Sequence, residues 1–130
     1  MLSNINVLVS LLGNTDTFLF NSSRMKDRNI VQLEGVIVGD VVYKTTTTNK
    51  NYCSFTIRTE TKGSEGFSST NTYVFVFAQP KIDYLKRVGA REGNRACVYA
   101  HLRTSKKEVG GHTIMQTIVT VDDVHIVKTN

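Results

Sequence analysis

The sequence predicts an all-β fold, a five-stranded Greek-key barrel with one short helix between strands 3 and 4. Short runs rich in Val, Ile, Thr and Tyr recur along the chain, and such residues favour strands. Segments rich in Gly, Asn and Ser separate the runs, as turns do between strands. Helical spacing of apolar residues occurs in one segment, which Pro80 opens and in which Ile82, Leu85 and Val88 recur.

Length and composition are those of one globular domain with a basic surface. A hydrophobic share of 40% over 130 residues suffices for one core. Lys and Arg total 16 against 11 Asp and Glu, so the net charge of +5 favours a polyanionic partner, a nucleic acid before an acidic membrane surface. Cys53 and Cys97 lack metal-site spacing and are expected to be free thiols. No apolar run approaches the ~20 residues of a membrane span.

Residues 1–28 differ from the rest and are expected to form an N-terminal extension. Met1–Phe20 has no Lys or Arg and one acid, Asp16. Basic residues then arrive together: Arg24, Lys26 and Arg28. An acid-poor, Ser-containing start favours an organellar targeting segment. A second interpretation is an ordered N-terminal strand, because apolar residues alternate at Ile5, Val7, Val9 and Leu11. A disordered tail is the third interpretation.

The first two strands are predicted at Asn29–Tyr43 and Tyr52–Thr61, where apolar and polar residues alternate. Within the first strand, Gly39-Asp40 indicates a bulge. The second strand is expected to turn Phe55 and Ile57 inward. Its outward residues are Ser54, Thr56 and Arg58.

The third strand, Asn71–Ala78, has one aliphatic and one aromatic face. Val74 and Val76 alternate with three rings: Tyr73, Phe75 and Phe77. Side chains alternate along a strand, so the valines are expected in the core and the rings outside. A row of rings beside basic residues is how proteins hold unstacked bases, although burial of both faces is the alternative. The preceding Lys62–Thr70 is predicted as a mobile loop with Phe67 at its tip.

Pro80 is expected to begin the helix and Gly89 to end it. The fourth strand is predicted at Arg95–Thr104. Its inward residues are Val98, Ala100 and Leu102, and its outward residues are Cys97, Tyr99, His101 and Arg103.

Ser105–His112 is predicted as a charged hairpin loop that carries Lys106 and Lys107. Thr113–Val121 is predicted as the fifth strand. A turn at Asp122-Asp123 and a short strand at Val124–Val127 follow. Three strands, a helix and two strands are the order of an OB-fold barrel, whereas the four-stranded RNA-recognition fold needs two helices.

From Asn29 to Lys128 the chain resembles the bacterial-type and mitochondrial single-stranded-DNA-binding proteins. The run Asn29–Gly35 resembles the family's first strand, and Phe55–Thr59 its second. Val98–Thr104, which ends in Leu-Arg-Thr, resembles the fourth strand. Val121–Val127 resembles the last. The order and spacing of these pieces make the resemblance specific.

Two departures from the family pattern concern the binding residues and the tail. The chain has no Trp: Asn71 stands where the third strand of the family usually has one, and Lys107 stands near the position of another. Rings are found further along the same predicted face. The end of the chain, Lys128-Thr129-Asn130, lacks the acidic tail of bacterial members and is similar to mitochondrial ones.

The resemblance implies an OB-fold nucleic-acid-binding domain at residues 29–130 that binds and protects single-stranded DNA with little sequence preference. It implies a role in mitochondrial DNA replication and maintenance, with another organelle or a nucleoid as the alternative location. It also implies a homotetramer paired through the Asn29–Leu33 edge, with no cofactor, metal or catalytic residue. Outward parity and loop position predict the interface residues: Thr56, Arg58, Lys62, Phe67, Tyr73, Phe75, Phe77, Tyr99, His101, Arg103, Lys106 and Lys107.

Two other functions remain open from the sequence. The chain can be an OB-fold structural subunit of a larger protein or ribonucleoprotein assembly, with its aromatic face against protein, or an RNA-binding OB protein. An enzyme is not expected, because no catalytic triad or phosphate-binding glycine loop occurs. The three His residues lack the spacing of metal ligands: His101, His112 and His125.

Overall fold

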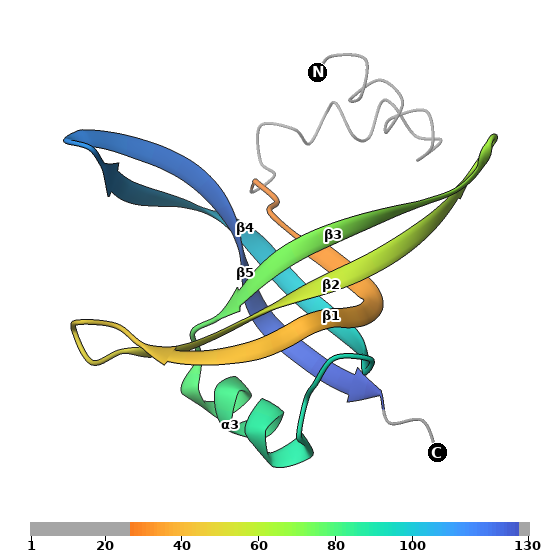
Figure 1. The fold of residues 1–130 in the computed structure, drawn as a ribbon, viewed down its shortest axis with the longest axis horizontal. Coiled ribbons are helices and arrows are strands. Elements are labelled where there is room, and N and C mark those ends of the chain that lie inside the picture. The colour runs from red at the N-terminus through yellow and green to blue at the C-terminus, as the bar shows by residue number, and fades with distance from the viewer. Residues whose placement is uncertain (1–26, 128–130) are drawn as a thin grey trace.

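The computed structural model describes residues 27–127, which form a closed barrel of five strands and one helix (Figure 1). The elements are β1 (Val31–Thr45), β2 (Asn51–Gly63), β3 (Gly66–Val76), α3 (Gln79–Val88), β4 (Arg95–Val109) and β5 (His112–Val127). Around the barrel the order is β1-β2-β3-β5-β4, with β3 and β5 parallel and the other neighbours antiparallel. The predicted OB-fold is confirmed. The expected extension at residues 1–28 lies almost wholly outside the described residues.

The core is filled from alternating strand positions, as the sequence predicted. Val74 and Val76 are fully buried from β3, and Phe55 and Ile57 from β2. β4 adds Val98 and β1 adds Ile37; α3 closes the core with Ile82 and Leu85. Leu102 was expected inside but is 44% exposed. It lies where β4 leaves the barrel, and the Asn29 side chain pairs with its backbone N–H and carbonyl at 2.8 and 2.6 Å.

β1 closes the barrel because it serves two neighbours in succession. Val31–Val36 pairs with β4, and Val36–Thr45 pairs with β2. Gly35 lies at this exchange, where a Cβ would approach the Arg58 carbonyl oxygen to 2.2 Å. The predicted bulge is confirmed at Gly39, whose φ of 76° lies between the β1–β2 pairs on either side. A bulge increases local bending, which β1 needs to wrap the barrel.

Three hairpins extend beyond the barrel as arms (Figure 1). The predicted loop at Lys62–Thr70 is wrong, because β2 and β3 stay paired up to Gly63 and Gly66. The predicted loop at Ser105–His112 is also wrong, since β4 and β5 pair up to Val109 and His112. Gly110 and Gly111 have successive positive φ values of 56° and 79°, as two-residue hairpin turns require. In both arms the glycines lie at the turn, and the polar residues that flank them remain paired as strands.

β5 is one strand, so the predicted turn at Asp122-Asp123 is wrong. Tyr99 pairs with Asp123 and Ala100 with Val121, which leaves Asp122 as the extra residue of a bulge. The bulge shifts the alternation of side chains along β5. Val121 before it and Val124 after it therefore both face the core, although they are three residues apart in sequence.

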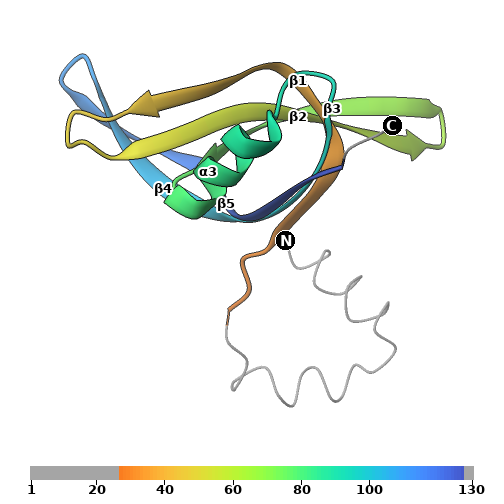
Figure 2. The same cartoon turned by 90° about the horizontal axis from the view of Figure 1, so that it is seen from below.

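α3 was predicted correctly in position and limits. Pro80 lies in its first turn, and Gly89 caps its end with a φ of 68°. Its buried residues pack toward β2 and β5, where the helix lies across one end of the barrel (Figure 2). Among the described residues, no helix has the length and apolar character to cross a membrane.

Candidate nucleic-acid interface

Four rings form a continuous row on the outward face of β2 and β3, called here the aromatic row: Tyr52 of β2, Tyr73 and Phe75 of β3, and Phe77, one residue after β3 ends. The Tyr73 and Phe75 centroids are 4.9 Å apart, and Phe75 and Phe77 stack within 12° of parallel at 6.1 Å. Tyr52 approaches Phe75 and Phe77 to 6.3 and 6.0 Å. Tyr73 is 53% and Phe77 37% exposed, so ring faces remain open to solvent. Such a surface offers π-faces to unstacked bases.

Sequence reasoning missed Tyr52, although the signal was present. Tyr52 has the same strand parity as Ser54 and Thr56, which were assigned to the outward face. It was passed over because it begins the strand. The pairing places it across from the end of β3, beside the last ring of the row.

Ser54 fixes one end of the aromatic row. The Tyr73 hydroxyl donates a hydrogen bond of 2.9 Å to Ser54 Oγ, which is almost wholly buried. Thr56 lies directly across from Tyr73. The Tyr73 ring is therefore held on the sheet before any ligand binds, which lowers the entropy cost of stacking a base on it.

β4 brings a cation to the other end of the row. The Arg103 guanidinium carbon lies 4.7 Å from the Phe77 ring centroid, within cation–π range. Tyr99 is half exposed, and Gln32 of β1 donates a hydrogen bond of 3.4 Å to its hydroxyl. The structure thus brings Arg103 to the rings, whereas Tyr99 lies on the β1 side of the face.

His101 lies on the same face and is held by a carboxylate. Its Nδ1 is 2.9 and 3.0 Å from the two oxygens of Asp122, the bulge residue of β5. Thr120 pairs with Phe75 on one side and His101 on the other. Its side chain is 8% exposed, and Oγ1 has no hydrogen-bond partner among the described residues. Three polar side chains from two strands, His101 of β4 with Thr120 and Asp122 of β5, therefore adjoin the aromatic row.

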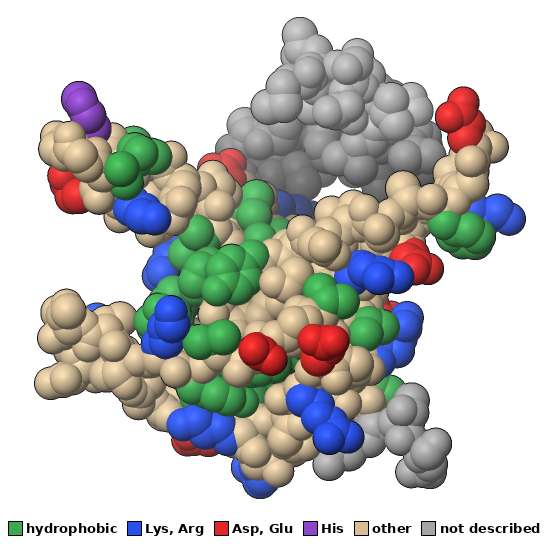
Figure 3. Space-filling view, viewed as in Figure 1, with side chains coloured by type: hydrophobic (Ala, Val, Ile, Leu, Met, Phe, Trp, Pro, Cys, Tyr) green, Lys and Arg blue, Asp and Glu red, His purple; other side chains and the backbone are tan. Residues whose placement is uncertain are grey.

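The remaining candidates lie on the arms. Lys62 pairs with Phe67 near the tip of the β2–β3 arm, and Phe67 is 74% exposed. Lys106 and Lys107 follow each other on the β4–β5 arm and so point to opposite sides of it. Figure 3 shows hydrophobic side chains gathered between the β4–β5 and β1–β2 arms, with Lys and Arg side chains around them. The arms are thus placed to flank a bound strand rather than to form its floor.

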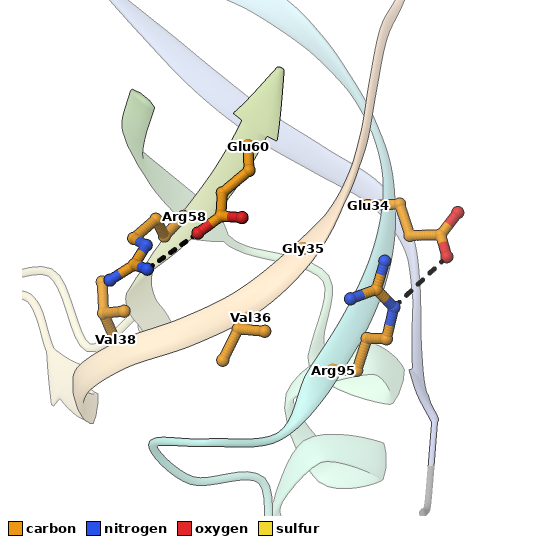
Figure 4. Close-up of a pocket in the computed structure, with 7 residues that line it drawn as sticks. All are labelled: Glu34, Gly35, Val36, Val38, Arg58, Glu60 and Arg95. Carbon is orange, nitrogen blue, oxygen red and sulfur yellow. Dashed lines mark hydrogen bonds and ion pairs between the residues drawn. The ribbon is translucent and has the colours of Figure 1, made fainter. Parts of the chain in front are cut away.

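Arg58 borders a separate cleft of about 360 Å³ between β1 and β2 (Figure 4). Arg58 pairs with Glu60 at 2.9 Å, and Arg95 pairs with Glu34 at 3.4 Å across the cleft mouth. The lining also includes Gly35, Val36 and Val38. Its two positive charges are balanced by two negative ones. Arg58 lies two residue pairs beyond Tyr73 along the β2–β3 ladder. Its guanidinium is already paired with the Glu60 carboxylate.

Two groups near the site have displaced pKa values. The Lys81 ammonium, which donates a 2.7 Å hydrogen bond to Asp123, lowers the pKa of that carboxyl, although desolvation opposes the shift. Asp123 is thus engaged toward α3, unlike its neighbour Asp122. Burial raises the pKa of the Cys53 thiol to about 11, and Cys53 and Cys97 are both free. Within residues 27–127, no group of three or more potential metal ligands gathers.

No protein-family model and no curated protein sequence matches this chain. Solved structures do match its fold. A Plasmodium falciparum SSB in complex with ssDNA superposes with a TM-score of 0.64 at 17% identity, covering 80% of this chain and 98% of its own. Rim1, a mitochondrial single-stranded DNA binding protein from S. cerevisiae, gives 0.62 at 20% identity, covering 81% and 99%. Another crystal form of Rim1 gives 0.60 at 18%, covering 80% and 100%. The chain has the OB-fold of single-stranded-DNA-binding proteins.

Proposed function

We propose that this chain binds and protects single-stranded DNA with little sequence preference. The observation that carries the proposal is the aromatic row, exposed at Tyr73 and Phe77 and ending in the Arg103–Phe77 cation–π contact. The fold shared with the P. falciparum and yeast proteins supports it. Partial exposure of Tyr73 and Phe77 shows that these rings are not buried within the chain and are available to a partner. The alternative, a structural subunit whose aromatic face lies against another protein, is distinguished by the titration below. The chain is proposed to act by binding, not by catalysis.

The mechanism follows from the two kinds of side chain on the face. Each base stacked on a ring contributes about 1–3 kcal/mol, and every base has a π-face, so preference among sequences is small. Lys and Arg neutralise phosphates and release counterions, which makes affinity fall as salt rises. Arg103 brings a positive charge directly to the aromatic row, because its guanidinium lies over the Phe77 ring. Duplex DNA binds weakly because its bases are already stacked on one another.

The experiment that tests the proposal is a fluorescence-anisotropy titration with labelled oligo-dT at low and high salt, with duplex of equal length as the control ligand. We expect tight, salt-sensitive binding of oligo-dT over duplex. Phe75→Ala is expected to weaken oligo-dT binding about 5- to 150-fold, the equivalent of one stacked base. A triple Tyr73→Ala/Phe75→Ala/Phe77→Ala variant is expected to bind at the level of duplex.

Tyr43→Ala is the matched control, because Tyr43 has the same 37% exposure as Phe77 but its ring contacts Lys86 of α3, outside the aromatic row. It is expected to bind as the parent does. Absence of oligo-dT binding by the folded protein at low salt would refute the proposal. An equal-length oligo-U in the same titration separates DNA binding from RNA binding.

We also propose self-association through β1. Along Val31–Gly35, β1 is paired with β4 on one side, while its pairing with β2 begins only at Val36. Its other edge carries backbone groups without a strand partner among the described residues, and such edges invite pairing with another copy. A homotetramer is the assembly proposed from the family resemblance of the sequence, and a mitochondrion is the location proposed from the likeness to the mitochondrial protein Rim1. Light scattering across protein concentrations tests the assembly, since a monomer at all concentrations would contradict it.

A further inference from the structure

Asp122 is an acidic side chain on the face proposed to bind a polyanion, and a negative charge is unfavourable there. Asp122 projects from the β5 bulge and contacts His101 of β4, two residues along that strand from Arg103. A carboxylate repels phosphate, so the sugar-phosphate backbone of a bound strand is expected to avoid this point. A base edge carrying N–H donors suits it, because an ionised carboxylate is an acceptor only.

The strand register brings this carboxylate near the stacking surface. β3 and β5 run parallel with Phe75 opposite Thr120. Asp122 follows Thr120 by two residues along β5 and contacts His101, the partner of Thr120 on β4. A base stacked on Phe75 would therefore turn an edge toward Thr120 and this pair.

Asp122 keeps acceptor capacity for such an edge. Among residues 27–127, the hydrogen-bond partner of its oxygens is His101 Nδ1, at 2.9 and 3.0 Å. A carboxylate offers about four lone-pair sites. One N–H from the imidazole leaves the others free. The imidazole also fixes the direction of the carboxylate before a ligand arrives.

Thr120 supplies a second, independent observation. It lies between Phe75 and His101, its side chain is 8% exposed, and its Oγ1 has no hydrogen-bond partner among the described residues. A buried hydroxyl without a hydrogen-bond partner is destabilising. A polar ligand atom that enters between Phe75 and His101 would relieve that penalty. The unpartnered hydroxyl and the carboxylate share one neighbour, His101: Thr120 pairs with it across the strands, and Asp122 contacts its ring.

Base chemistry selects the ligand. Guanine presents two adjacent donors, N1–H and N2–H, which match the two oxygens of one carboxylate. Adenine and cytosine present an amino group beside a ring acceptor, and thymine presents one N–H between two carbonyl acceptors. A carboxylate repels these acceptors, so each of the three bases can donate only one hydrogen bond to it. Unstacked bases are commonly bound through these Watson–Crick edges.

We propose that Asp122, His101 and Thr120 form a base-edge site that makes this chain bind guanine-containing single strands more tightly than oligo-dT. The inference rests on the single-strand binding proposed above and adds a preference to it. The rings and cations supply sequence-tolerant affinity, and the base-edge site discriminates at one position of the bound strand.

The test compares three labelled oligomers of equal length by anisotropy: oligo-dT, the same oligomer with guanines separated by thymines, and one with inosine in place of guanine. Inosine lacks the N2 amino group and keeps N1–H. The guanine oligomer is expected to bind about fivefold tighter than oligo-dT, the low end of what a bidentate pair gives. The inosine oligomer is expected to fall between them.

Variants assign the preference to the site. Asp122→Asn is expected to bring guanine and thymine oligomers within twofold of each other without weakening oligo-dT, since an acid is removed from an anion-binding face. Asp123→Asn is the matched control: it removes the same charge from the next residue, whose carboxylate pairs with Lys81. It is expected to keep the preference. Thr120→Val keeps the side-chain shape, and it is expected to lower the preference with thermal stability unchanged or raised.

The outcomes separate the two proposals. Equal binding of guanine and thymine oligomers by the parent chain overturns the base-edge site and leaves the proposed function intact. A guanine preference that persists in Asp122→Asn, or that Asp123→Asn abolishes equally, also overturns it. Failure to bind any oligomer overturns both.

Discussion

Gly35→Ala is the substitution for which the structure sets a magnitude most directly. An ideal Cβ at Gly35 would lie 2.2 Å from the carbonyl oxygen of Arg58 and 2.9 Å from its carbonyl carbon. Real Cβ atoms essentially never come closer than 3.0 Å, so β1 and β2 would have to separate by about 0.8 Å at this point. Both obstructing atoms are backbone, so no side-chain rotation can relieve the overlap.

The displacement falls where β1 exchanges β4 for β2 and where Ile37 and Ile57 pack as neighbours in the core. Overpacking of a well-packed interior typically costs 1–3 kcal/mol, and a backbone overlap belongs at the upper end, about 3 kcal/mol. For a folded domain of this size that corresponds to a fall in Tm of roughly 12 to 24 °C. Thermal unfolding followed by circular dichroism, with urea denaturation alongside, measures both quantities.

Gly63→Ala is the matched control for Gly35→Ala. Both glycines lie in strands, but a Cβ at Gly63 would meet only the carbonyl oxygen of Gly66, at an ordinary 3.5 Å. Its effect is expected to stay within about 0.5 kcal/mol, as for most surface substitutions. A Gly35→Ala protein whose Tm lies within about 3 °C of the parent would refute the argument from close approach, because β1 and β2 would then not be in contact there.

Three further predictions concern the thiols, acid stability and the core. Maleimide labelling at pH 8 is expected to modify Cys97 and spare Cys53, because burial raises the pKa of the Cys53 thiol to about 11; rapid double labelling would contradict this. The lowered folded-state pKa of Asp123 means that its pair with Lys81 stabilises the fold above the ordinary Asp pKa of about 3.9 and is lost as pH falls through the folded value. Lys81→Gln is therefore expected to cost at most about 1 kcal/mol near neutral pH, by urea denaturation, with a difference that shrinks in acid; a difference that grew in acid would reverse the sign. Phe55→Ala is expected to cost about 3–5 kcal/mol in the same assay, and a loss below about 1 kcal/mol would mean that the site repacks.

The aromatic row shows what could be predicted locally. Alternation is a property of the strand itself, so Val74 and Val76 could be assigned to the core and Tyr73 and Phe75 to the outer face from sequence alone. The same alternation places Tyr52 on the outward face of β2. That Tyr52 lies beside Phe77 depends on the register between β2 and β3, which alternation does not give.

The errors have a common cause. Polar arms were taken for loops because their residues bury no core, yet β2–β3 and β4–β5 pair almost to their glycine turns. Asp122-Asp123 was taken for a turn because two acids interrupt an apolar run. Only the partner strand decides that such an interruption is a bulge.

Local sequence patterns sufficed for the class of fold, for the barrel-forming parts of the strands, for the limits of α3 between Pro80 and Gly89, and for which face of β3 is aromatic. These follow from side-chain periodicity and from the backbone conformations of Pro and Gly, which act within a few residues. The tertiary structure decided how β1 is shared between two neighbours, that Arg103 reaches Phe77, and that the Asp122 carboxylate meets His101. Each of these depends on register between strands far apart in the chain, which no local pattern specifies.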